Sequence, residues 1–167
     1  GYETIKVQTN NKLFFTSEKK DVALLVLEKK EVEKILGTVP VIPSIKERGN
    51  CKDFITKGFP KATFGEEIVV LYPTWLQHFE NNRFQLQLHE DYLGKLTQGF
   101  SGSPVFLVAK NEIYLYGIFT RFRSEEKGKV IYCQYIETIN ELLEASFLPQ
   151  ISFSYFGQHG LTKGFFE

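Results

Sequence analysis

The sequence has no methionine, only two cysteines and only three histidines among its 167 residues. Two cysteines, Cys51 and Cys133, cannot form the disulfide framework that stabilises many small secreted domains. We therefore interpret them as reduced core thiols and expect a cytoplasmic protein. No Cys/His cluster has the spacing of metal ligands, so we expect neither a metal ion nor another cofactor.

An excess of charge and a long apolar run are also missing. The 20 basic and 20 acidic residues cancel, which argues against the basic footprint of a nucleic-acid-binding protein. No apolar run approaches the roughly 20 residues of a membrane-spanning helix, and no signal peptide is recognisable. We expect neither a nucleic acid nor a membrane as partner. Because the chain opens at Gly1 without a methionine, we expect native sequence to precede it.

Aromatic residues are plentiful, with 16 phenylalanines and eight tyrosines, and they favour strands. The apolar fraction of 43% excludes disorder and provides for a hydrophobic core. Apolar runs and alternating patterns predict strands at 2–8, 12–16, 21–27, 51–58, 67–72, 83–88, 103–108, 113–122 and 129–135. Helices are predicted at 28–36, ended by Gly37, and at 136–146, where Ile136, Ile139, Leu142 and Leu143 share one face.

The most informative stretch is 99–104, which reads Gly-Phe-Ser-Gly-Ser-Pro and precedes an apolar strand. Glycines let the backbone reach positive φ and keep side chains away from a substrate. In such a turn, the N–H groups of Gly99 and Ser101 can point at one spot and stabilise an oxyanion. By itself the stretch also fits a plain turn between two strands.

A second stretch lies upstream, where Asp21 opens the apolar run Val-Ala-Leu-Leu-Val-Leu. Together the two stretches resemble the chymotrypsin/trypsin-like serine proteases, over roughly residues 13–145. The resemblance implies an all-β, trypsin-like double β-barrel with a C-terminal helix, of which this chain holds an incomplete first barrel. The implied organisation is 1–36 for the remnant of that barrel, 37–50 for the connector, 51–146 for the second barrel with its helix, and 147–167 for a tail or linker.

By this resemblance, Ser101 is the nucleophile and Asp21 is the carboxylate that orients the catalytic base. The substrate is then a protein or peptide. The base of the family is a histidine that precedes the aspartate, and this chain has none there. His78, in an expected loop, His89, after an expected strand, and His159 all follow Asp21. We expect the histidine upstream of this chain. A catalytically inactive, partner-binding domain is the alternative, and a viral protease is a third possibility.

The family also suggests a substrate pocket, here formed by Lys95, Gln98, Thr120, Arg121 and Phe122. Trypsin-like members carry an acidic residue at about the position of Lys95. With Arg121 nearby, we therefore hypothesise a preference for acidic residues beside the scissile bond; two exposed basic side chains are the plain interpretation. Phe100 stands where zymogen-activated members have an aspartate, so we expect regulation by another domain or a partner protein.

Overall fold

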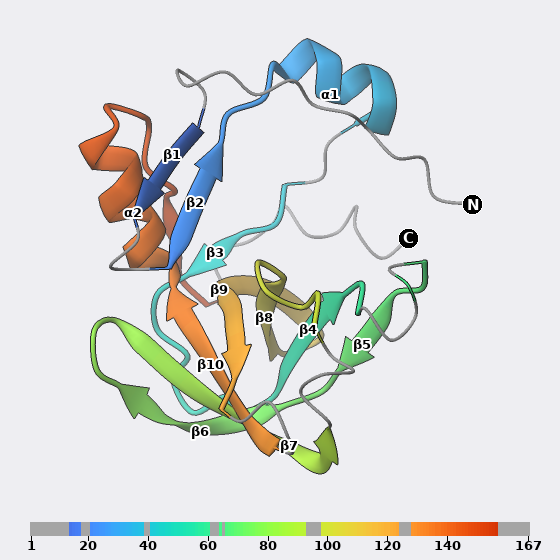
Figure 1. Cartoon of the computed structure of the whole chain (residues 1–167). Coiled ribbons are helices and arrows are strands. Elements are labelled where there is room, and N and C mark those ends of the chain that lie inside the picture. Colours follow the sequence, from blue (N-terminus) through green and yellow to red (C-terminus); the bar gives the residue numbers. More distant parts are fainter. Residues whose placement is uncertain are drawn as a thin grey trace.

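The computed structural model describes residues 14–17, 21–38, 41–60, 64, 66–92, 98–123 and 128–156. The predicted strand at 2–8 lies outside these residues, and the predicted strand at 12–16 lies partly outside them. In chain order the described elements are β1 (Phe14–Ser17), β2 (Val22–Leu25), α1 (Lys29–Leu36), β3 (Ser44–Ile45), β4 (Phe54–Gly58), β5 (Val69–Leu71), β6 (Thr74–Phe79), β7 (Arg83–Tyr92), β8 (Pro104–Ala109), β9 (Glu112–Phe122), β10 (Gly128–Tyr135), α2 (Ile136–Ala145) and β11 (Phe153–Ser154) (Figure 1).

One large sheet dominates the molecule, with the strand order β5-β4-β8-β9-β10-β7-β6. All neighbours along this path are antiparallel. The sheet curves so far that its last strand, β6, returns to the beginning of β4: Asp53, just before β4, forms a β-bridge with Thr74 in β6. Beside this bridge, the N–H of Trp75 donates to the carbonyl of Lys52 at 2.8 Å. The expected all-β fold with a C-terminal helix is confirmed.

The inner face of this curved sheet carries the hydrophobic core. Alternation along the strands places side chains such as Phe54, Phe84 and Phe119 on that face, where each is at most 2% exposed. The rings pack against one another in tilted, edge-on and stacked arrangements; Phe84, for example, packs edge-on against Tyr116 at 5.1 Å between centroids and stacks on Trp75 at 5.8 Å. This packing uses the aromatic residues that the composition provides and fixes the strands that carry the candidate site.

Two histidines were assigned wrongly from the sequence. His78 lies within β6, whereas its segment was expected to be a loop. His89 lies inside β7, which extends beyond the expected end of that strand. Gln85, a polar residue between two apolar residues of β7, is buried as well. The side-chain nitrogen of Gln77 in β6 donates to the Gln85 side chain at 2.7 Å, so its polar group is paired.

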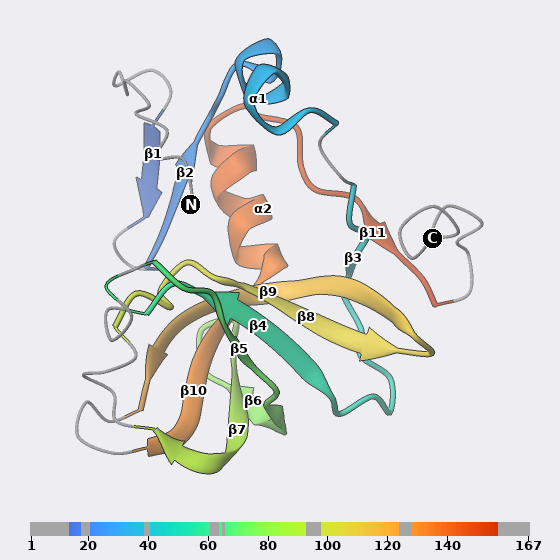
Figure 2. The same cartoon turned by 90° about the vertical axis from the view of Figure 1, so that its right-hand side faces the viewer.

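The helix α2 joins the large sheet to a separate two-stranded sheet formed by β1 and β2 (Figures 1 and 2). Ile136, Ile139 and Leu142 are buried as the helical spacing predicted, and Leu143 is half-buried. The β2 strand is less enclosed than its apolar sequence suggested, since Leu25 is 41% exposed. Neither α1 nor α2, the helices of the described residues, is long and apolar enough to cross a membrane.

Two short strands lie in segments that were interpreted as connector and tail. The strand β3 runs parallel to both β9 and β11, and Ser44 pairs with Phe153 (Figure 2). After β11, the ring of Phe156 packs edge-on against Tyr114 at 5.5 Å. The described part of the tail therefore packs against the large sheet. The domain boundaries given above stay predictions.

Candidate active site

The turn over residues 98–103 leads into β8, and its two glycines have backbone angles that other residues rarely adopt. Gly99 has φ +108° and Gly102 has φ +85°. A Cβ on Gly99 would lie 2.4 Å from the carbonyl oxygen of Phe59, while one on Gly102 would meet nothing within 4 Å. Gly99 is therefore required both for its conformation and for its close approach to the segment after β4.

Hydrogen bonds and a buried ring hold this turn in place. The N–H of Gly102 donates to the carbonyl of Phe119, and the N–H of Phe119 donates to the carbonyl of Ser103, both at 2.9 Å. Phe100 is 1% exposed and packs against Phe119 at 5.6 Å. Gly58 makes room for this ring, because a Cβ there would lie 2.7 Å from Phe100. The turn is thus fixed to β9 and β4.

Ser101 lies at the exposed tip of the turn, and its hydroxyl donates to the carbonyl of Thr120 at 2.6 Å. A β-bulge in β9 accounts for this contact. Arg121 pairs with Tyr132 and Phe119 with Cys133, so Thr120 is the extra residue without a register partner in β10. A bulge takes one residue out of the ladder, which leaves the Thr120 carbonyl for the serine hydroxyl.

Among the described residues, four N–H groups of the turn have no backbone acceptor, those of Gln98, Gly99, Phe100 and Ser101. The hydrogen bonds of the turn use the N–H of Gly102 and of Ser103 instead. Gly99 and Ser101 are both exposed. Two amide N–H groups without an acceptor, near a serine hydroxyl, can donate hydrogen bonds to a negatively charged oxygen. The assignment of Gly99 and Ser101 as an oxyanion hole stays a prediction.

The other predicted catalytic groups are not in contact with Ser101. Asp21 is exposed, precedes β2 with φ +51°, and forms no hydrogen bond or ion pair with another described residue. The Nδ1 of His78 is hydrogen-bonded to the hydroxyl of Tyr135. His89 is exposed in β7, and His159 lies outside the described residues. Within the described part of the chain, no imidazole reaches the serine.

The predicted pocket residues differ in their surroundings. Lys95 lies outside the described residues, and Gln98 is exposed at the start of the turn. The Thr120 hydroxyl donates to the carbonyl of Tyr132 at 2.8 Å. Arg121 is exposed, and its guanidinium carbon lies 4.9 Å from the centre of the Tyr132 ring.

Phe122 is half-buried and packs edge-on against Phe119 at 5.1 Å. The sequence analysis missed Tyr132 as a neighbour of this region. Only the register between β9 and β10 brings Tyr132 opposite Arg121, and no local pattern encodes that register. The predicted pocket thus combines polar, cationic and aromatic groups from β9 with an aromatic ring from β10.

The groups with displaced pKa values belong to the core rather than to the turn. Burial raises the pKa of Tyr116 to about 12, and burial with the hydrogen bond to Glu112 raises the pKa of Tyr114 to about 12. Burial also raises the pKa of Tyr135 and of the Cys133 thiol. No group of three or more potential metal ligands occurs among the described residues.

The fold is similar to that of solved serine proteases. The chain is similar to the crystal structure of a thermostable serine protease, AL20, from an extremophilic microorganism, with TM-score 0.54 and 19% identity over 76% of this chain. It spans only 58% of the length of that protein. A protease named Anisep from Arthrobacter nicotinovorans matches with TM-score 0.48 and 14% identity, over 74% of this chain and 55% of its own. No family model and no curated protein matches the sequence.

Proposed function

We propose that this chain is a module of a trypsin-like serine endopeptidase that hydrolyses peptide bonds through an acyl-enzyme on Ser101. The observation that carries the proposal is the Ser101 turn, where the serine is an exposed residue and the N–H groups of Gly99 and Ser101 have no backbone acceptor among the described residues. The similarity of the fold to that of solved serine proteases supports the same conclusion. Its substrate is a protein or peptide, since the reaction requires a peptide bond.

In the proposed reaction, Oγ of Ser101 attacks the carbonyl carbon of the scissile bond, and its proton passes to a histidine. The carbonyl oxygen becomes negatively charged and is stabilised by the N–H groups of Gly99 and Ser101. When the C–N bond breaks, the histidine returns the proton to the leaving amine. Water then hydrolyses the ester and regenerates the serine hydroxyl.

The histidine and its orientation by Asp21 are the parts of the proposal that need residues beyond this chain. A serine hydroxyl is a weak nucleophile without an adjacent base, and the described histidines contact other groups or solvent. We propose that the histidine lies upstream of this chain and is oriented by Asp21. The two unpaired cysteines support a reduced, intracellular setting within a longer protein.

A partner-binding domain without catalysis is the second candidate. The observation in its favour is that the Ser101 hydroxyl donates to a backbone carbonyl and that no imidazole of the described residues reaches it. Such a domain would retain the peptide-binding surface around β9 and lack turnover.

Labelling with a fluorophosphonate probe distinguishes the two candidates. The probe reacts with a serine only where a base activates its hydroxyl and donors stabilise the developing charge. We expect labelling of the native protein that contains this chain, and none of its Ser101→Ala variant. Ser103→Ala is the matched control, because it removes a neighbouring hydroxyl of the same turn, and it should retain labelling. Labelling that survives in Ser101→Ala, or is absent from the native protein, would contradict the protease proposal.

A further inference from the structure

Arg121 is an exposed cation next in sequence to Thr120, the hydrogen-bond partner of the candidate nucleophile. The Thr120 carbonyl accepts the hydrogen bond from the Ser101 hydroxyl at 2.6 Å. The guanidinium of Arg121 lies over the ring of Tyr132, 4.9 Å from the ring centre. Tyr132 in turn packs edge-on against Phe79 at 5.2 Å. The aromatic stack reduces the number of conformations that the arginine side chain samples, so binding a ligand costs less conformational entropy.

The positive charge of Arg121 has no carboxylate partner among the described residues. The ion pairs of these residues are Lys29 with Glu33 and Lys46 with Glu137. The Tyr132 ring carries no negative charge, so the guanidinium beside it keeps its positive charge and its N–H donors. Arg121 is also exposed, so a ligand approaching the Ser101 turn can reach it. A planar fork of donors of this kind matches the two oxygens of a carboxylate.

We propose that Arg121, supported by Tyr132, binds a carboxylate of the peptide that occupies the Ser101 site, which makes the site selective for acidic peptides. This inference rests on the proposed function, because it assumes that the turn receives a peptide. It requires neither Lys95 nor the missing histidine. The neighbouring Arg123 is also exposed and follows Phe122 in sequence. Its backbone N–H donates to the carbonyl of Val130.

Peptide binding without turnover tests the inference. Short acetylated peptides with a single Glu at successive positions, and the same peptides with Gln, are titrated by calorimetry into the Ser101→Ala variant of this chain. We expect the best Glu peptide to bind about 2- to 5-fold more tightly than its Gln counterpart, the range of one exposed ion pair. This ratio should fall towards one at about 1 M salt, where the Debye length is about 3 Å.

Variants at two arginines identify the group that recognises the acid. Arg121→Gln should reduce the Glu/Gln ratio to near one. Arg121→Lys should retain part of the ratio, because it keeps the charge but loses the planar fork. Arg123→Gln is the matched control and should retain the full ratio. A ratio that survives Arg121→Gln, or a chain that binds none of the peptides, overturns the inference.

The result of the peptide titration can be distinguished from the result of the probe labelling that tests the protease proposal. The titration uses Ser101→Ala, so it does not depend on the serine hydroxyl or on a histidine. Absence of probe labelling together with a Glu/Gln ratio that depends on Arg121 would reject catalysis and support acidic-peptide binding. Probe labelling together with no Glu preference would support the protease and reject the role of Arg121.

Discussion

The hydroxyl of Ser101 has a single proton, and in this structure it is donated to the carbonyl of Thr120. A catalytic base would have to accept the same proton. Activation of Ser101 therefore requires the hydroxyl to turn from the Thr120 carbonyl towards an imidazole, a rotation about one side-chain bond. The backbone of the turn need not move, because Gly102 and Ser103 hold it through their own N–H groups.

The two glycines that flank Ser101 should differ in their sensitivity to a methyl group. Gly99→Ala combines an unfavourable positive φ with a clash against the Phe59 carbonyl, so we expect a loss of about 3 kcal/mol of folding free energy and of probe labelling. Gly102→Ala meets only the backbone penalty, about 1 kcal/mol, since its Cβ would be in open space. Urea unfolding measures both values. Equal costs would show that the approach to Phe59 is unimportant.

At the same scale, the sequence predicted the turn correctly but not its partners. Local residue types were enough to propose an exposed serine between glycines at 99–104. The contact with Thr120 depends on a bulge in β9, which is defined only by the pairing with β10. For the same reason the neighbour of Arg121, Tyr132, was not identified. Contacts between strands far apart in sequence leave no local pattern to read.

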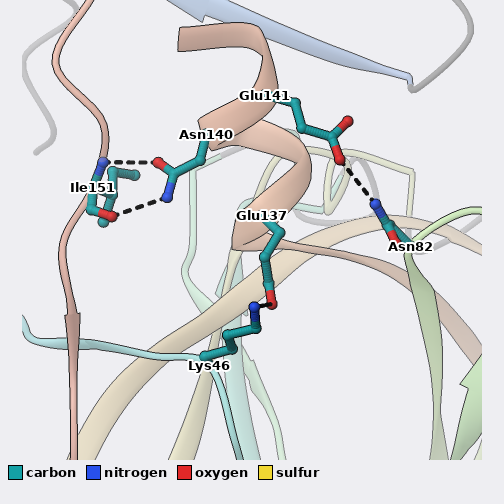
Figure 3. Close-up of polar contacts among 6 residues, drawn as sticks. All are labelled: Lys46, Asn82, Glu137, Asn140, Glu141 and Ile151. Atoms are coloured by element: carbon teal, nitrogen blue, oxygen red, sulfur yellow. Dashed lines mark hydrogen bonds and ion pairs between the residues drawn. The ribbon is translucent and has the colours of Figure 1, made fainter. Parts of the chain in front are cut away.

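At the scale of elements, α2 is tied to the segment that follows it by one buried side chain. The amide of Asn140 accepts from the N–H of Ile151 at 2.7 Å and donates to the carbonyl of the same residue at 2.9 Å (Figure 3). Asn140 is 8% exposed. On the solvent side of the helix, Glu141 accepts from the side-chain nitrogen of Asn82 at 3.0 Å. Only the Asn140 pair is shielded from water.

Removal of the two hydrogen bonds between the Asn140 side chain and the Ile151 backbone should destabilise the protein measurably. Asn140→Ala leaves the N–H and the carbonyl of Ile151 without their partner in a partly buried place, and we expect a loss of about 2 kcal/mol. Glu141→Ala removes the exposed hydrogen bond between α2 and Asn82 without touching a strained backbone position, and should cost less than about 0.5 kcal/mol. Thermal unfolding followed by circular dichroism compares them. If the two variants lose similar stability, the hydrogen bonds of Asn140 are not what fixes the segment after α2 to the helix.

The elements were predictable where strands are long and depended on context where they are short. Strands such as β7 and β9 have clear apolar patterns, and both helices have an apolar face or a glycine stop. By contrast, β3 and β11 have two residues each and exist only because they pair with other strands. The β6 strand was missed because Trp75, Leu76, His78 and Phe79 do not alternate with polar residues.

At the scale of the whole molecule, the aromatic core makes stability sensitive to high pH. Tyr116 is 2% exposed, and burial raises its pKa from 10.0 to about 12. Between these values the unfolded chain releases the phenolic proton while the folded protein retains it. The contribution of Tyr116 is therefore complete below pH 10 and decreases as the pH rises towards 12, by up to about 1 kcal/mol per pH unit.

The Tyr116→Phe variant tests this dependence. It should lower stability at neutral pH through the lost hydroxyl, yet its stability should decrease less steeply than that of the wild type between pH 10 and pH 12. Tyr72→Phe is the control, because Tyr72 is 64% exposed, and its profile should follow the wild type. Urea midpoints across this range provide the slopes. Parallel profiles for Tyr116→Phe and the wild type would exclude Tyr116 as a source of the alkaline loss.

The pairing of β3 with β11 also has a mechanical consequence. The chain enters the large sheet along β3 and, after tracing it, leaves along β11 in the same direction, with Ser44 beside Phe153. A pulling force applied to the residues before β3 and after β11 would slide these strands past each other, so their hydrogen bonds would be loaded together in shear. Tension between flanking parts of a polypeptide would then reach the strands around Ser101 only after the hydrogen bonds between β3 and β11 had broken.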